Sequence, residues 1–176
     1  MDATAFAFLV ETKAYLDNTR HPSRDLDLRI AKIIGEAPMN AVRVDTVEHD
    51  PGTEWETPGY SEAMAAVRRI ADRDARRTAR RKALETEAMG ICMPYTGDQL
   101  NALEALPDAE KPDHGWTITL TRTPEGAWSA HIQRDDTHVY RGESGPEDRT
   151  GALALLRAIL SARVEAGRRA RGLAAA

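Results

Sequence analysis

Three short runs of alternating apolar and polar side chains within residues 116–141 constrain the fold more than any other feature. Such alternation places every second side chain on one face of a strand and leaves the other face polar. Residues 123–126, Thr-Pro-Glu-Gly, predict a turn, because proline fixes one corner and glycine tolerates a left-handed one. Residues 134–137 predict a second turn. We therefore expect a small antiparallel sheet of three strands, or of four if the weaker run at 41–47 joins it.

The two turns also determine which side chains face each other across the sheet. The turn at 123–126 places Ile118 opposite Ile132, and the turn at 134–137 places Ile132 opposite Val139. One apolar row then crosses all three strands on the face that a core would cover. A slip of one residue would move these side chains to the other face, so the agreement between the two registers supports both.

The same registers predict a row of polar side chains on the outer face of the sheet. This candidate site consists of Thr119, His131 and Tyr140. It could bind a polar ligand, with His131 as an acid or base. The registers place no carboxylate beside this histidine, so a partly solvated or helix-covered sheet face is the simpler interpretation.

A long amphipathic helix is predicted after the strands. Residues 144–147, Ser-Gly-Pro-Glu, have the spacing of a capping box with an early proline. The apolar residues that follow recur at intervals of three and four, which predicts a stripe that covers the sheet. The stripe consists of Leu153, Leu156, Ile159, Leu160 and Val164. The chain is therefore predicted to be an α+β protein with a C-terminal covering helix.

Additional N-terminal and central helices complete the expected fold. Helices are predicted at 2–18 and 24–34, and two central helices are predicted to use Ser61 and Thr96 as N-caps. A chain of 176 residues is long enough for one well-buried domain. We expect residues 1–35 to form a helical segment of that domain and residues 36–176 its sandwich-like α+β part.

Cysteine content and hydropathy suggest a location for the protein. The single cysteine, Cys92, excludes an internal disulfide, and its apolar neighbours indicate a buried, inert thiol. Because the chain has no signal-like amino terminus and no long apolar run, we expect a soluble cytoplasmic protein without a membrane partner.

The charge of the chain is distributed unevenly. Residues 68–82 contain eight basic and two acidic side chains, a local net charge of +6, so the rest of the chain sums to −10. If these residues form one helix, Arg69, Arg73, Arg76 and Arg80 share one stripe. The predicted binding residues are Arg69, Arg73, Arg76, Arg77, Arg80 and Arg81. Such a stripe can follow the phosphates of a nucleic acid or a nucleotide.

Two alternatives to phosphate binding stay open for this stripe. It can be a solvated helix face that pairs with acidic residues of the same chain, or it can contact a second subunit. An acidic cluster around residues 48–56 could supply such a partner. No aromatic residue interrupts the stripe, so stacking on single-stranded bases is not predicted along this helix.

Motifs for catalysis or metal binding are absent from the sequence. The chain has no glycine loop for phosphate, no Gly-x-Ser-x-Gly elbow and no His-Glu-x-x-His. The acidic cluster at residues 48–56 has the spacing of neither a calcium loop nor a zinc site. The sequence predicts no cofactor and no metal, and it favours a protein that is not an enzyme.

Three segments resemble the phage ABA sandwich domain. Residues 25–35 are similar to its opening helix, residues 55–67 to its central helix with a Tyr-Ser start, and residues 150–162 to its closing helix. The chain departs from the family by an added N-terminal helix and by its arginine-rich stretch. The resemblance implies a small layered α+β fold of viral or prophage origin, with no known reaction and no catalytic residues.

These observations lead to a function hypothesis with two alternatives. The chain is expected to be a non-enzymatic phage or prophage accessory protein that contacts a host or phage protein in the bacterial cytoplasm, for example as an inhibitor of a host defence system. The first alternative is a nucleic-acid or nucleotide-binding protein that uses the arginine-rich helix at 68–82. The second is an enzyme with His131 as acid or base.

Overall fold

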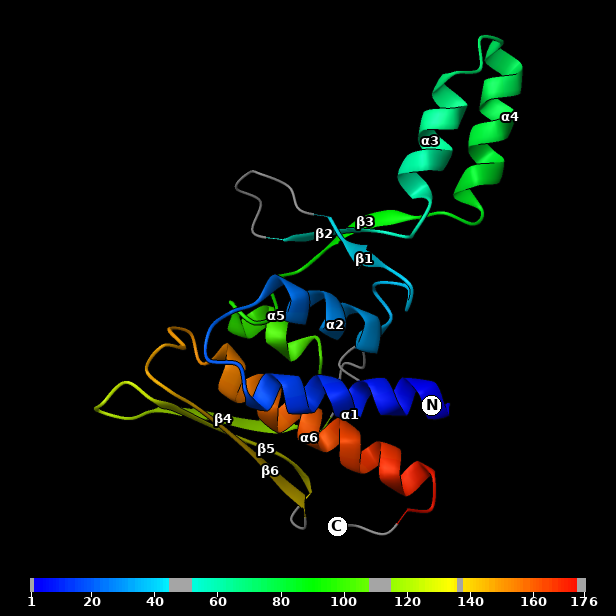
Figure 1. Ribbon diagram of the computed structural model, residues 1–176. Coiled ribbons are helices and arrows are strands. Elements are labelled where there is room, and N and C mark those ends of the chain that lie inside the picture. Colours follow the sequence, from blue (N-terminus) through cyan, green and yellow to red (C-terminus); the bar gives the residue numbers. More distant parts are fainter. Residues whose placement is uncertain (1, 45–51, 108–114, 136–137, 174–176) are drawn as a thin grey trace.

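The computed structural model describes residues 2–44, 52–107, 115–135 and 138–173. These residues form six helices and two three-stranded antiparallel sheets (Figure 1). The elements are α1 (Ala3–Asp17), α2 (Arg24–Ile34), β1 (Val42–Arg43), β2 (Thr53–Glu56), α3 (Tyr60–Arg68), α4 (Arg73–Leu84), β3 (Met89–Cys92), α5 (Gln99–Leu103), β4 (Thr117–Arg122), β5 (Trp128–Asp135), β6 (His138–Ser144) and α6 (Ala152–Ala170). The predicted α+β class is confirmed, with α6 packed on the sheet β4-β5-β6.

Helix α6 packs on strands β5 and β6. Gly142 of β6 lets the two backbones approach, since a Cβ atom at this position would overlap the carbonyl oxygen of Ala154 and would also meet Ala158. Leu153, Leu156 and Ile159 of the apolar stripe are completely buried. The predicted covering helix and the burial of its stripe are confirmed, whereas the contact with Gly142 is made by Ala154 and Ala158, which are not part of the stripe.

The first register of this sheet is as predicted, but the second is wrong by one residue. Ile118 pairs with Ile132, whereas Ile132 pairs with Tyr140 and not with Val139. The last ladder pair of the hairpin is Asp135 with His138 and not the predicted Arg134 with Thr137, and a β-bulge leaves Arg134 as an extra residue on β5 next to this pair. Together the two differences shift the partner of Ile132 by one residue. Tyr140 therefore belongs to the covered face, where its ring lies 6.3 Å from that of Trp116. Val139 points outward and is 47% exposed.

Helix α6 also begins later than the predicted capping box. Ser144 is the last residue of β6, and the helix begins at Ala152. Asp148, which is buried, takes the capping role: its carboxylate accepts hydrogen bonds from the backbone amides of Gly151 (2.9 Å) and Leu153 (3.0 Å). The Ser144 hydroxyl donates to the same carboxylate at 2.7 Å. The local motif was misleading because the strand continues through its first residue.

The opposite side of α6 packs against α1 and α5. Two arginines of α6 bond the backbone at the ends of these helices. Arg157 donates to the carbonyl oxygens of Leu16 (3.2 Å) and Thr19 (2.6 Å) at the end of α1. Arg163 donates to the carbonyl oxygen of Leu106, just after α5, at 3.0 Å. These carbonyls lie at or just beyond the C-terminal ends of α1 and α5, so each arginine caps a neighbouring helix.

A second sheet, β1-β2-β3, lies beyond α2 from the C-terminal sheet (Figure 1). The predicted run at 41–47 contributes β1 to this sheet and not a fourth strand to the other one; residues 45–47 lie outside the described part. Trp55 of β2 packs on Gly90 of β3, where a side chain would collide with its ring. The chain thus has two small sheets where one was expected.

Buried polar contacts join α2 to the segment before α5. Asp27 accepts hydrogen bonds from the backbone amide (2.7 Å) and the hydroxyl (2.8 Å) of Thr96. Burial raises the pKa of Asp27 to about 6. The N-cap of α5 is Asp98 and not the predicted Thr96. Ser61 is likewise not an N-cap, because α3 starts after Gly59 in a left-handed conformation with φ of 98°.

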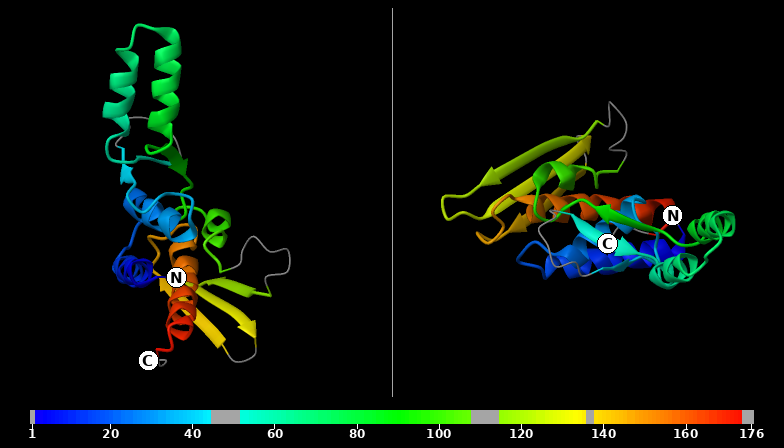
Figure 2. Two further views of the ribbon diagram at one scale, coloured as in Figure 1. Left: turned by 90° about the vertical axis from the view of Figure 1, so that its right-hand side faces the viewer. Right: turned by 90° about the horizontal axis from the view of Figure 1, so that it is seen from above.

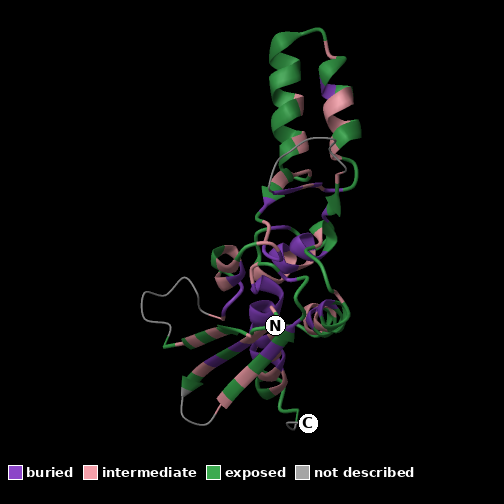
Figure 3. Cartoon of the chain, turned by 90° about the vertical axis from the view of Figure 1, so that its left-hand side faces the viewer, coloured by how far each residue is buried: buried purple, intermediate pink, exposed green. Residues whose placement is uncertain are grey.

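Helices α3 and α4 form a hairpin inserted between β2 and β3, here called the arm (residues 60–87). Figures 1 and 2 show the arm standing clear of the remaining elements. Figure 3 shows that its surface is mostly exposed, while the buried residues gather around α6 and α2. At the root of the arm, the backbone amide of Thr57 donates to the carbonyl oxygen of Ala88 at 2.8 Å. The arm thus extends a β-hairpin whose two strands are already paired.

Candidate functional site on the helical arm

The predicted single arginine-rich helix is two helices. Helix α3 ends with Arg69 as its C-cap, and α4 begins at Arg73 with Asp72 as its N-cap. The Asp72 carboxylate accepts a hydrogen bond from the backbone amide of Ala75 at 2.7 Å. Arg69 therefore does not continue the stripe of Arg73, and the predicted arrangement is wrong at this position.

Helix α4 packs against α3 through small side chains. Ala79 and Ala83 are its two half-buried residues, and the other ten residues of the helix are exposed. Val67 is the buried residue of α3. Alanine on one helix and valine on the other let the two helices approach closely, which leaves the long arginine side chains to project from the hairpin.

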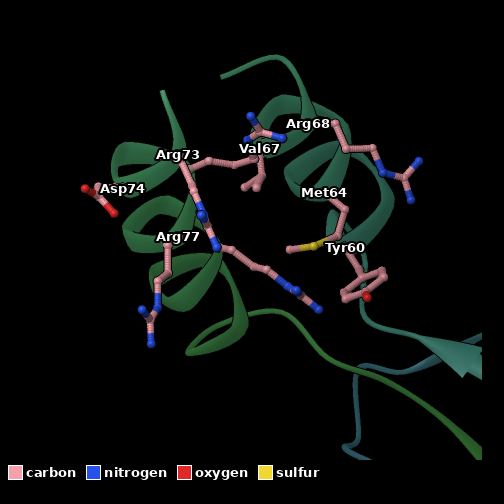
Figure 4. A pocket seen from close by; sticks show the side chains of 9 residues that line it. Tyr60, Met64, Val67, Arg68, Arg73, Asp74 and Arg77 are labelled. Atoms are coloured by element: carbon pink, nitrogen blue, oxygen red, sulfur yellow. The ribbon is translucent and has the colours of Figure 1, made fainter. Parts of the chain in front are cut away.

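The two helices enclose an open groove of about 960 Å³. Helix α4 contributes four of the predicted arginines, which are Arg73, Arg76, Arg77 and Arg80. Helix α3 contributes Tyr60, Met64, Val67 and Arg68. In Figure 4, Arg73 and Arg77 lie on one side of the groove and Tyr60, Met64 and Arg68 on the other. The site is therefore a cationic rim around a short aromatic and apolar wall.

The guanidinium groups of the arm have no carboxylate partner among the described residues. Among the residues that the structure describes, ion pairs connect Lys13, Arg29, Arg43 and Arg169 to acidic side chains. None of these ion pairs includes an arginine of the arm. Within the arm, Arg76 donates to the carbonyl oxygen of Ala71 at 3.0 Å. Asp74 is one of the residues that line the groove, but its side chain points away from Tyr60 and Met64 (Figure 4). The described site consequently carries a concentrated positive charge.

Tyr60, Met64, Val67 and Arg68 were not predicted as site residues. Tyr60, Met64 and Val67 recur at intervals of four and three, which is the pattern of one helix face. That pattern was available in the sequence, but their contact with the arginines depends on the chain reversing near Asp72. Aspartate at position 72 could have indicated the break, since it is a favoured N-cap residue.

The predicted site on the outer face of the C-terminal sheet does not form as expected. Thr119 and His131 face each other and are exposed, but Tyr140 lies on the covered face, so Arg141 takes the third position in the row. The His131 ring lies 3.5 Å from the Ser129 hydroxyl, and its cross-strand neighbour on β6 is Arg141.

Cys92 is a buried thiol, as the sequence predicted. It is 1% exposed, and its sulfur donates to the carbonyl oxygen of Thr53 at 3.5 Å. Burial raises the pKa of this thiol to about 11, so the reactive thiolate is disfavoured near neutral pH.

The acidic cluster is described only in part, because residues 45–51 lie outside the described part. Of its remaining members, Glu56 accepts a hydrogen bond from the Ser61 hydroxyl at 2.6 Å at the base of the arm. Among the described residues, no three histidine, cysteine or acidic side chains gather as metal ligands.

Comparison with known proteins adds no family or function. No family model, no curated protein and no solved structure matches the chain. The resemblance to the phage ABA sandwich domain therefore stays a prediction. None of the described helices is both long and apolar enough to cross a lipid bilayer.

Proposed function

We propose that the protein binds nucleic acid through the arm. The observation that carries this proposal is the cluster of exposed arginines on a projecting hairpin, without a carboxylate partner among the described residues. Arginines that are not neutralised within their own chain can replace the counterions of phosphates, and the release of those ions drives binding. The hairpin presents them beyond the acidic remainder of the chain, which would otherwise repel a polyanion.

A charge-reversal experiment tests this proposal. Fluorescence anisotropy with labelled DNA and RNA, at several salt concentrations, compares wild type with Arg73→Glu/Arg76→Glu/Arg80→Glu. We expect wild-type affinity to fall steeply with salt, and the triple variant to lose binding. If residual binding is measurable, its plot of log K against log salt should be shallower by about two units, since three phosphate contacts are removed.

A matched control separates a local site from net charge. Arg20→Glu/Arg141→Glu/Arg149→Glu changes the charge equally at exposed positions away from the arm. This variant is expected to bind within a few-fold of wild type, because charges beyond a Debye length of about 8–10 Å are largely screened. Equal loss in both variants, or no binding by wild type at low salt, would contradict the proposal.

A second candidate is contact with a host or phage protein, as predicted from the resemblance. The specific observation is an apolar strip on the outer face of β3: Met89, Ile91 and Met93 are 56%, 58% and 55% exposed. Alternate residues of one strand lie on one face, and methionine-rich surfaces adapt to protein partners. A protein retained from bacterial lysate by wild type, but not by Met89→Ser/Ile91→Lys, would support this function.

A further inference from the structure

We infer that the groove of the arm holds a nucleotide of a single strand, with its base stacked on Tyr60 and its flanking phosphates held by the arginines. This inference rests on the proposed nucleic-acid function and specifies its ligand. It also reverses the expectation, drawn from the sequence, that base stacking does not occur along the arginine-rich stretch. The aromatic ring comes from the neighbouring helix and not from the stretch itself.

The chemistry of the groove differs between its wall and its rim. Tyr60, Met64 and Val67 form a continuous apolar wall on α3, because they occupy one helix face. The guanidinium groups come from Arg68 on the same helix and from the α4 arginines across the groove. A nucleotide has the same two parts, an aromatic base and a charged phosphate. Stacking on aromatic side chains within a positively charged groove is how single strands are bound without sequence preference.

A duplex fits these features less well than a single strand. In a duplex the faces of the bases are stacked on each other, so an aromatic ring inside a groove has no base face to contact. Phosphate contact alone would need the arginines and leave the Tyr60–Met64–Val67 wall without a role. The groove volume of about 960 Å³ lies within the range of roughly 300–1,000 Å³ that is usual for pockets holding small organic ligands. A single base with its sugar can enter such a space.

Tyr60 is held at the most constrained point of the arm. Its backbone amide donates to the carbonyl oxygen of Thr57 at 3.1 Å, and Gly59 supplies the left-handed turn before it. The Thr57 hydroxyl donates to the Glu87 carboxylate at 2.8 Å, which joins the two ends of the arm. The backbone of Tyr60 is therefore fixed to the paired strands below it, which reduces the ordering needed when a base stacks on the ring.

The test compares a labelled 12-nucleotide oligothymidine with a 12-base-pair DNA hairpin, on the full chain and at low salt. The variants are Tyr60→Leu, Tyr60→Phe and, as a control on an exposed tyrosine of α1, Tyr15→Leu. We expect Tyr60→Leu to weaken single-strand binding about 5- to 150-fold, the range for the loss of one stacked base. Tyr60→Phe and Tyr15→Leu should bind as wild type does, and duplex binding should change little in any of them.

The outcomes separate this inference from the function on which it rests. The stacking site would be overturned if Tyr60→Leu bound the single strand as tightly as wild type does. If the arginine triple variant lost all binding in the same experiment, the proposed nucleic-acid function would still stand. Absence of binding to both probes by wild type would overturn both. Thymidine 5′-monophosphate should compete only weakly, because it lacks the flanking phosphates. Competition by the mononucleotide at the same concentration as the oligomer would overturn the single-strand assignment in favour of a free nucleotide.

Discussion

In α6, eleven of nineteen residues are buried, whereas none of the twelve residues of α4 is. Both helices carry several arginines, but they use them differently. Arg157 and Arg163 of α6 donate to backbone carbonyls of neighbouring elements. Those of α4 have exposed side chains, with one backbone contact, that of Arg76. The same residue type therefore connects helices in one region and remains available to a ligand in the other.

The difference indicates how stability and binding are divided in the chain. Burial of apolar side chains is the main favourable term in folding, and it is concentrated around α6. The arm contributes little to that burial, so its residues can be changed with small effects on the free energy of unfolding. Each prediction below pairs or contrasts the two regions, beginning with the largest expected effect.

Truncation of one leucine in each region, buried in α6 and exposed in α4, gives the largest contrast. Leu156→Ala in α6 is expected to lower the free energy of unfolding by about 2–5 kcal/mol, because it leaves a cavity in the core. Leu84→Ala at the end of α4, where the side chain is 48% exposed, is expected to change it by about 0.5 kcal/mol or less. Urea denaturation followed by circular dichroism measures both. Similar losses in the two variants would mean that the arm is part of the core.

Removal of the two aspartates that cap α6 and α4 gives the next contrast. Asp148→Ala is expected to cost about 3 kcal/mol, because it leaves the buried Ser144 hydroxyl and two backbone amides without an acceptor. Asp72→Ala removes one exposed cap bond in the arm and is expected to cost about 1 kcal/mol. The two midpoints of urea denaturation are compared at pH 7. A larger loss for Asp72→Ala than for Asp148→Ala would reverse the comparison.

The pKa of Asp27 predicts a pH dependence in the region outside the arm. Because its pKa is raised to about 6 in the folded chain, the native state binds a proton more tightly than the unfolded state does. The contribution of Asp27 to the free energy of unfolding should therefore fall as pH rises from about 4 to 6, and stay constant above that. The difference between wild type and Asp27→Asn is expected to change by about 2–3 kcal/mol over this range. A difference that is constant from pH 4 to pH 7 would contradict the raised pKa.

Replacement of the arm is expected to have the smallest effect on stability. Thr57 and Ala88 are already hydrogen bonded, so an Asn-Gly turn in place of residues 58–87 would close a two-residue hairpin between them. We expect the free energy of unfolding to change by about 1 kcal/mol or less, while nucleic-acid binding is lost. A fall of several kcal/mol in thermal or urea denaturation would show that the arm supports the remaining fold.

Local periodicity was sufficient to predict much of the C-terminal fold. The burial of the α6 stripe and the pairing of Ile118 with Ile132 depend on neighbouring residues in the sequence, and both were predicted correctly. The bulge at Arg134 could not be predicted in this way. One extra residue does not change the apolar–polar alternation of the strand segments on either side of it, so the sequence pattern does not reveal the bulge. The capping box at residues 144–147 satisfied a local rule, but pairing of Ser144 with Trp128 extended the strand through it.

The site was predicted in part for a related reason. The arginines were evident from charge alone, but in residues 68–82 the division into two helices was marked only by Asp72, a favoured N-cap residue. The groove exists because the chain reverses between Arg69 and Asp72, which places the α3 face of Tyr60, Met64 and Val67 opposite the arginines of α4. Contact between residues of two helices is a tertiary property, and a single amphipathic pattern does not contain it.

The bonds from Arg157 to the carbonyls of Leu16 and Thr19 also bear on how the chain folds during synthesis. They join residues separated by 141 and 138 positions. Helix α1 is made before α6, with which it makes most of its contacts, so until α6 has left the ribosome α1 can pack only against α2. Contacts at such separations slow folding, because a long loop must close before they form. We therefore expect nascent chains that end before residue 152 to leave α1 packed only against α2 and prone to association with other unfolded chains.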